Sequence, residues 1–211
     1  KEHQKTKTAL LSVETQRQLS DFSVIFVMLS FEMDYDNLLT VLELGNIKLR
    51  AELRNEKEPL VIIGGPCATF NPEPLAAVAD AFVIGEGEET VQKILDTIYT
   101  NTSKEEKLLN LANLPGVYVP KYYTPEYNED DEFVGMTHDE RVPAKIARQW
   151  VKDIDAYPHT SAIVTSGTEF EDMYIVEVAR GCGRHCRFCM AGYCFRKPRP
   201  RALENILADI A

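Results

Sequence analysis

The stretch Ser23-Val-Ile-Phe-Val-Met-Leu29 decides the fold class, because it is a continuous apolar run between polar residues. Such a run is typical of a strand that is buried on both faces of a parallel sheet. A helix is predicted directly after it, over 36–44, where leucine and valine recur at helical spacing and Gly45 marks the end. A strand followed by an amphipathic helix is the repeating unit of α/β proteins.

Two more units of this kind follow along the chain. Buried strands are predicted over 60–63 and 81–84, each followed by glycine, and helices are predicted over 73–79 and 88–99. The alternation indicates an α/β fold with a doubly wound parallel sheet, Rossmann-like or flavodoxin-like, joined by right-handed crossovers. We assign this domain to residues 1–100.

After residue 100 the alternation of apolar strands and amphipathic helices ends. A connector with short strands around turns is predicted over 101–172, outside the core. A further strand over 173–179 precedes a cysteine-rich loop, and a helix is predicted over 202–210. Residues 173–211 therefore form a third predicted region.

Composition limits the class of protein. The chain has 211 residues, 45% of them hydrophobic, and a formal net charge of −10, which is typical of a globular protein. No apolar stretch approaches the roughly 18 residues that a membrane span needs, so we expect neither a membrane protein nor a secreted one. The five cysteines are an odd number and three lie within eight residues, which favours a metal or redox site in a reducing compartment over disulfides. We therefore expect a cytoplasmic protein.

One window inverts the overall acidity. Residues 178–203 contain seven basic side chains and no acidic one. A basic window around cysteines in an acidic chain indicates that something anionic is held there.

The cysteine loop is the strongest chemical motif. Cys182, Cys186 and Cys189 have the spacing C-x3-C-x2-C, and three thiolates in one tight loop suit an iron-sulfur cube with one iron left open for a ligand. An open metal position favours catalysis over electron storage. Cys194 allows a four-cysteine zinc site as an alternative, although its spacing is not that of a usual zinc ribbon, and we expect Cys194 to pack behind the loop. Cys67 is expected to be a small buried residue.

The cysteine spacing, with Phe188 before the last cysteine, resembles the signature of the radical SAM superfamily. The resemblance implies that Cys182, Cys186 and Cys189 bind a 4Fe-4S cluster and that Phe188 packs near the adenine of S-adenosylmethionine. In that family an electron from the cluster cleaves S-adenosylmethionine to a 5′-deoxyadenosyl radical. The strand over 173–179 would then be the first of a partial TIM-like barrel. An electron donor is implied as a partner, and the substrate is left open.

Glycine-rich turns follow two predicted strands at the carboxyl edge, where α/β sheets bind ligands. They consist of Gly64, Gly65 and Pro66, and of Gly85, Glu86 and Gly87. With NPEPL at residues 71–75 they resemble the cobalamin-binding-like domain that precedes the barrel in one branch of radical SAM proteins. The D-x-H-x-x-G motif that supplies a histidine to cobalt is absent, so a cobalamin pocket and a plain scaffold both stay open.

Nearly the whole chain, including LPGVYVP and VEVARGCGRHCRFCMAG, resembles the branch labelled Fe-S oxidoreductases. This resemblance implies that the first strand of the sheet lies before Lys1 and that most of the barrel follows Ala211. We therefore expect an enzyme whose fragment, as given, is inactive, because one strand, a loop and a helix do not enclose a radical. Two alternatives stay open: a zinc-binding or nucleic-acid-binding module that uses the basic residues 180–201, and a chain whose loop holds no metal.

Overall fold

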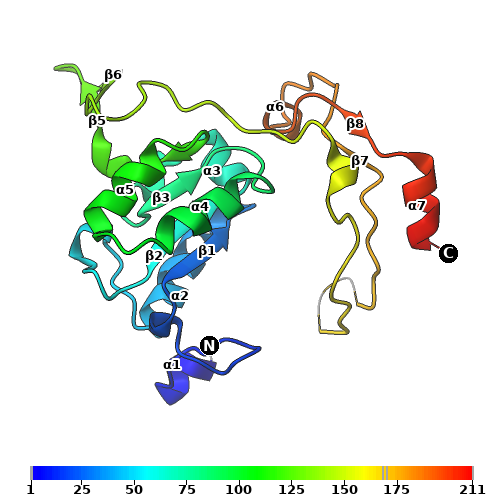
Figure 1. The fold of residues 1–211 in the computed structure, drawn as a ribbon, viewed down its shortest axis with the longest axis horizontal. Coiled ribbons are helices and arrows are strands. Elements are labelled where there is room, and N and C mark those ends of the chain that lie inside the picture. The colour runs from blue at the N-terminus through cyan, green and yellow to red at the C-terminus, as the bar shows by residue number, and fades with distance from the viewer. Residues whose placement is uncertain (1, 168, 170, 211) are drawn as a thin grey trace. The chain divides into compact units, whose positions relative to one another are not determined.

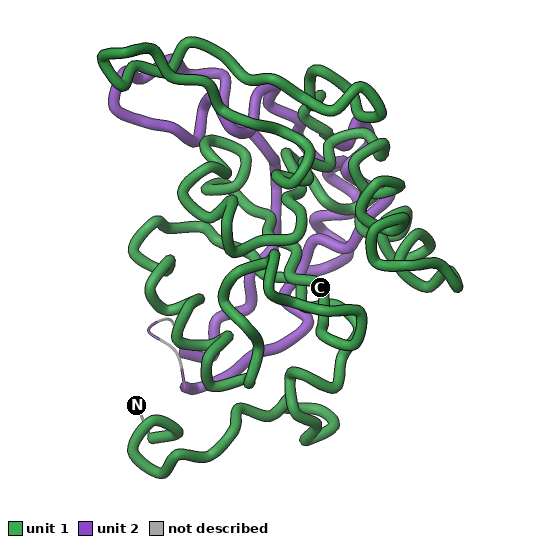
Figure 2. Tube along the Cα trace, turned by 90° about the vertical axis from the view of Figure 1, so that its left-hand side faces the viewer, with its two compact units in different colours: residues 1–150 green, residues 151–211 purple. Residues whose placement is uncertain are grey.

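The computed structural model describes residues 2–167, 169 and 171–210. The chain divides into two compact units, residues 1–150 and 151–211 (Figure 2). The predicted boundaries after residues 100 and 172 concern the domains of the family and stay predictions. No helix within the described residues is both long enough and apolar enough to cross a membrane.

Unit 1 is built around one sheet of parallel and antiparallel strands. Its strands run in the order β1-β2-β3-β4, with bounds Val24–Met28, Leu60–Gly64, Ala81–Val83 and Val117–Tyr118. The first three are labelled in Figure 1. β1 pairs with β2 and β2 with β3 in parallel, and β4 is antiparallel to β3. The predicted α/β class is therefore confirmed.

The helices of unit 1 precede or connect these strands. They are α1 (Glu2–Thr6), α2 (Tyr35–Leu44), α3 (Pro66–Phe70), α4 (Thr90–Ile98) and α5 (Lys104–Ala112). α4 and α5 lie next to each other (Figure 1). The Ser103 hydroxyl caps α5 by accepting the N–H of Glu106 at 3.2 Å, as is typical of an N-cap serine.

The helix predicted over 73–79 is wrong in extent. The structure has only a 3₁₀ turn over Glu73–Leu75, and the α-helix of this crossover, α3, comes earlier. Pro72 and Pro74 have no N–H to donate, and the N–H of Glu73 is taken by the Asn71 side chain at 3.2 Å. The N–H groups of Leu75 and Ala76 donate to the carbonyls three residues earlier, at 3.1 and 3.0 Å, so the chain makes a 3₁₀ turn here.

The core is centred on β2, whose Val61 and Ile63 are fully buried. β1 lies at the edge of the sheet, and its Phe26 and Met28 are 41% and 78% exposed. The prediction that 23–29 is buried on both faces is therefore wrong for these two side chains. Phe26 and Met28 alternate with half-buried Ile25 and Val27, so they share one face of the strand, and at this edge that face is left open to solvent.

Part of the predicted connector belongs to the core of unit 1. Leu111 of α5 and Val117 of β4 are fully buried, although we expected the residues after 100 to lie outside the core. The expected strands around a turn are found as an antiparallel hairpin, β5 (Tyr123–Tyr127) and β6 (Phe133–His138). Packing against β3 decides which of the short elements are buried.

Unit 2 contains short elements around the cysteine loop. They are β7 (Ala179–Arg180), α6 (Ala191–Cys194), β8 (Arg199–Pro200) and α7 (Leu203–Ile210). The predicted strand over 173–179 is wrong in extent, since before Ala179 its only pairing among the described residues is a bridge of Val176 to Thr160. An apolar run becomes a strand only where neighbours take up its backbone hydrogen bonds. The helix expected over 202–210 is confirmed by α7.

Candidate functional site

The cysteine loop leaves β7 through Gly181. This glycine has a φ of +96°, and a Cβ here would lie 2.3 Å from the carbonyl oxygen of Phe195. Only glycine fits a positive φ against such a close backbone. The loop is also closed by a hydrogen bond from the N–H of Cys182 to that carbonyl, at 3.3 Å. Gly181 therefore fixes the point where the predicted ligands begin.

All three predicted ligands carry free thiols. Cys186 is exposed, whereas Cys182 and Cys189 are half-buried. The N–H of Arg184 donates to Sγ of Cys182 at 3.4 Å, and the N–H of Cys189 donates to the carbonyl of Cys186 at 3.2 Å. Among the described residues, no three cysteine, histidine or acidic side chains lie close enough to hold one metal ion. The structure thus places the three sulfurs on one loop without gathering them.

Two further side chains of this loop are those of Phe188 and His185. Phe188 is 91% exposed, so its ring has a free face. His185 contacts Arg196, with 3.0 Å between Nδ1 and Nη2. The Arg196 guanidinium in turn lies 4.2 Å from the centroid of the Tyr193 ring, a cation–π contact. His185 therefore links the loop to the segment after α6.

Several arginines of the basic window hold unit 2 together. Arg201 is buried and bonds to the carbonyl oxygen of Ile154 and to the carboxylate of Glu177. Arg180 also donates to Glu177, at 2.7 Å, and buried Arg199 donates to a backbone carbonyl. Hydrogen bonds from Arg180, and then from Arg201, lower the pKa of Glu177. These arginines have internal partners, so the window offers fewer charges to an external anion than its composition suggests.

The two cysteines outside the motif are buried, as expected. Cys194 is 6% exposed and Cys67 is 4% exposed. Burial, and then the nearby charge of Glu32, raises the pKa of the Cys67 thiol, so the thiol form is favoured. Both side chains therefore behave as small packing residues.

The glycine turns lie at the carboxyl ends of β2 and β3. Gly65 has a φ of +95°, and a Cβ here would lie 2.6 Å from the carbonyl oxygen of Leu29. Gly85 has a φ of +107°, and its Cβ would lie 2.1 Å from the carbonyl oxygen of Gln149. Gly85 also forms a parallel bridge with Gln149. At both glycines the close backbone neighbour is the chain itself.

The other residues of these turns serve the neighbouring elements. Gly64 ends β2, and Pro66 begins α3 at a position that suits proline. The carbonyl of Gly87 accepts the N–H of Val91 at 2.8 Å at the start of α4. The N–H of Glu86 donates to Gln149 at 3.0 Å. A cobalamin-like pocket at these turns stays a prediction.

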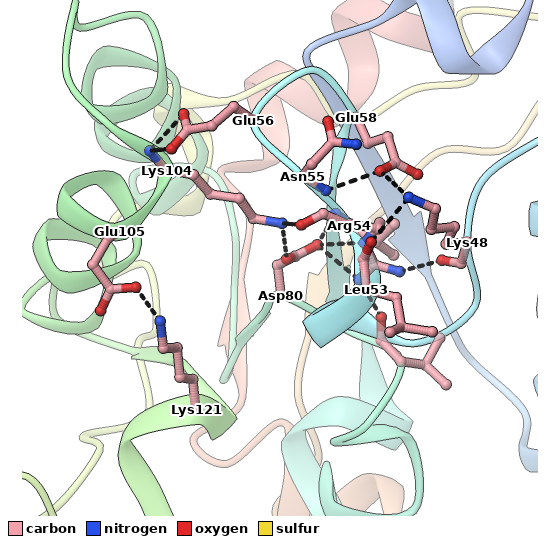
Figure 3. A network of polar contacts seen from close by, with 12 residues as sticks. Lys48, Leu53, Arg54, Asn55, Glu56, Glu58, Asp80, Lys104, Glu105 and Lys121 are labelled. Carbon is pink, nitrogen blue, oxygen red and sulfur yellow. Dashed lines mark hydrogen bonds and ion pairs between the residues drawn. The ribbon is translucent and has the colours of Figure 1, made fainter.

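A buried ionic network at the amino ends of β2 and β3 was not predicted. Arg54 donates to Oδ2 of Asp80 from Nε at 3.0 Å and from Nη2 at 2.8 Å (Figure 3). Lys104 reaches Oδ1 of Asp80 at 3.1 Å, and the N–H of Val61 donates to Oδ2 at 2.8 Å. Arg54 and Asp80 are 0% and 2% exposed at their side chains. The only local signal is an aspartate directly before an apolar strand.

The comparisons with known proteins agree with this architecture. Residues 1–120 match the family described as radical SAM proteins, N-terminal. This match covers more than half of the chain, so the chain belongs to that radical SAM family.

A particular relative is the protein named "Uncharacterized protein MJ0966" of Methanocaldococcus jannaschii. It is 28% identical to the chain over 198 residues. The aligned part covers 92% of this chain and 36% of the relative. The chain therefore spans little more than a third of the length of that relative.

Proposed function

We propose that this chain carries the cluster loop of a radical SAM enzyme, with Cys182, Cys186 and Cys189 as the ligands of a 4Fe-4S cluster. The observation that carries the proposal is the presence of three free thiols on one loop of a chain from this family. Their type and number suit a cube with one open iron. The N–H of Arg184 near Cys182 Sγ, at 3.4 Å, supports the same role, because hydrogen bonds to cluster sulfurs tune the reduction potential.

The three sulfur atoms do not surround one point, as is expected of ligands that the metal itself brings together. Metal sites are often assembled by the metal itself, since the free ligands gain nothing by approaching one another. Cys186 is exposed and Cys182 and Cys189 are half-buried, so incoming iron has access to them. We therefore expect cluster assembly to draw the loop together.

When bound, such a cluster supplies the electron that cleaves S-adenosylmethionine to the 5′-deoxyadenosyl radical. In this proposal Phe188 offers its exposed ring to the adenine. Arg184 and Arg187, both exposed on the loop, offset the negative charge of the thiolates. An electron-donor protein completes the system, and an oxidoreductase reaction of the whole protein belongs to the same proposal.

The test is anaerobic reconstitution of the chain with iron and sulfide, followed by a visible spectrum and an iron count. We expect about four irons per chain, lost when Cys182, Cys186 and Cys189 are all replaced by alanine. Cys67→Ala is the matched control and keeps the iron, because Cys67 lies in unit 1.

A zinc site would give a different result. One colourless zinc per chain, lost on Cys194→Ala as well, would overturn the proposal in favour of a four-cysteine site. An iron content unchanged by the triple replacement would also overturn it.

A further inference from the structure

Unit 1 contains a pocket of about 800 Å³ on the amino-terminal side of the sheet. It is lined by the segment before β2, the segment before β3, the start of α5 and the residues after β4. Pockets of roughly 300–1,000 Å³ are the usual size for small-molecule sites. It lies at the opposite strand ends from the glycine turns, so it is distinct from the ligand site expected there.

The carboxylates of the lining differ in how they are neutralised. Three have basic partners: Glu52 has Arg50, Asp80 has Arg54 and Lys104, and Glu105 has Lys121. Glu56 accepts the backbone N–H of Lys104 at the start of α5, where the positive end of the helix dipole offsets part of its charge. Glu73 is the exception and forms no ion pair among the described residues. Its partner is the hydroxyl of Tyr118, which donates to Oε1 at 2.5 Å.

The phenol does not remove the charge of Glu73. Burial, and then the hydrogen bond to Glu73, raises the pKa of Tyr118 well above its usual value, so the hydroxyl keeps its proton. Tyr118 therefore orients the carboxylate and leaves its negative charge uncompensated. A half-buried carboxylate in this state attracts a cation and repels an anion.

Aromatic and apolar side chains form the walls beside this charge. The ring centroids of Tyr118 and Tyr123 are 5.0 Å apart, and the planes are tilted by 56°. The remaining apolar lining consists of four alanines, two prolines and Leu108. Phe82 stacks on Tyr118 and His138 stacks on Tyr123, and both tyrosines are buried, so the two rings form a wall that excludes water beside the charge.

We propose that this pocket binds a small organic cation, an ammonium group on an apolar body, with Glu73 as the counter-ion and Tyr118 and Tyr123 as the aromatic wall. The paired carboxylates elsewhere in the lining are unavailable to such a ligand. The volume of about 800 Å³ admits a molecule well beyond a bare inorganic ion. The proposal stands apart from the cluster, because every lining residue belongs to unit 1.

The test is titration of the 211-residue chain with benzylamine, which is cationic at pH 7, and with benzyl alcohol, its neutral counterpart, by calorimetry and tyrosine NMR. We expect saturable binding of benzylamine, about tenfold tighter than that of benzyl alcohol, since about 1.4 kcal/mol of charge interaction gives tenfold. The signals of Tyr118 and Tyr123 should shift with the cation. Equal affinities, or no saturable binding of benzylamine, would overturn the proposal.

Matched variants locate the charge. Glu73→Gln keeps an acceptor for the Tyr118 hydroxyl but removes the charge, so benzylamine should lose about tenfold in affinity. Glu52→Gln, at a carboxylate already paired with Arg50, should change the affinity by less than about twofold. Far-UV circular dichroism of Glu73→Gln and Glu52→Gln separates loss of charge from loss of folding. Equal effects of Glu73→Gln and Glu52→Gln would contradict the assignment.

Discussion

The ionic network of unit 1 and the cysteine loop of unit 2 treat polar groups in opposite ways. Asp80 is 2% exposed at its side chain, and both of its oxygens have partners from the chain itself. Cys186 is exposed, and no metal-binding cluster involving it is found in the described residues. The network is complete without any ligand, whereas the three thiols of the loop are not gathered at one point. The closed network stabilises the fold, and the exposed loop is accessible to the cluster that we propose for it.

Two arginines of the basic window, Arg201 and Arg184, show the same contrast within unit 2. Arg201 is 5% exposed and bonds to internal carbonyls and Glu177, whereas Arg184 on the loop is exposed. A buried arginine without a partner is costly, so internal partners are required at Arg201. Exposure frees Arg184 for an external anion.

The largest effect should come from opening the closed network. Asp80→Ala leaves the buried Arg54 guanidinium without its carboxylate, which should cost about 3–5 kcal/mol in the free energy of unfolding. Urea denaturation followed by far-UV circular dichroism measures this. Glu52→Ala removes an exposed partner of Arg50 and should cost no more than about 1 kcal/mol. Similar losses for both variants would contradict the comparison.

A smaller effect is expected at the carboxyl end of β3, where the chain closes on itself. Gly85→Ala forces a side chain into a positive φ beside Gln149 and should destabilise unit 1 by about 1–3 kcal/mol. Gly64→Ala is the matched control, since its Cβ would lie 3.7 Å from Val83, an ordinary contact. Thermal unfolding of both variants gives the difference. If Gly85→Ala is as stable as Gly64→Ala, the backbone of Gln149 does not pack closely against Gly85, and the prediction is contradicted.

A further loss should follow acidification of unit 2. The pKa of Glu177 is held below its usual 4.5 by Arg180 and Arg201, so its contribution is present above pH 4.5. It is lost as the pH falls through the lower native pKa, because the unfolded state then binds the proton first. Hydrogen exchange of residues 151–167 between pH 6 and 3 follows this loss. A Glu177→Gln variant should lack this pH step, and an unchanged step would assign it to another group.

The smallest effect on stability should come from the open loop. Cys186→Ala removes an exposed side chain and should change the free energy of unfolding by no more than about 0.5 kcal/mol. The same substitution should abolish iron incorporation. The comparison fails if this variant is destabilised as strongly as Asp80→Ala.

Local patterns predicted most of the parallel sheet. The apolar runs at 23–29, 60–63 and 81–84 contain the strands β1, β2 and β3, and the helical repeat after the first run is α2. The pattern at 173–179 was misleading, since the same apolar character there does not produce a full strand. The apolar pattern of a segment predicts that it can form a strand, and its neighbours in the fold decide whether the strand forms.

The candidate sites divide in the same way. The three cysteines were found from their spacing, because ligands on one loop lie close in sequence. The pocket at Glu73 and Tyr118 was missed, because its walls come from four separate segments. No spacing rule connects a carboxylate in one crossover with a phenol on β4.

The sequence by itself therefore determined the α/β class and the cysteine loop, since both depend on residues that are neighbours along the chain. Only the tertiary structure decided that Arg54 meets Asp80, 26 positions away, and that Gln149 lies against Gly85. It also decided that Phe26 and Met28 are exposed on an edge strand. Strand order and the path of returning segments control these contacts, and both result from packing the whole unit rather than from any local pattern.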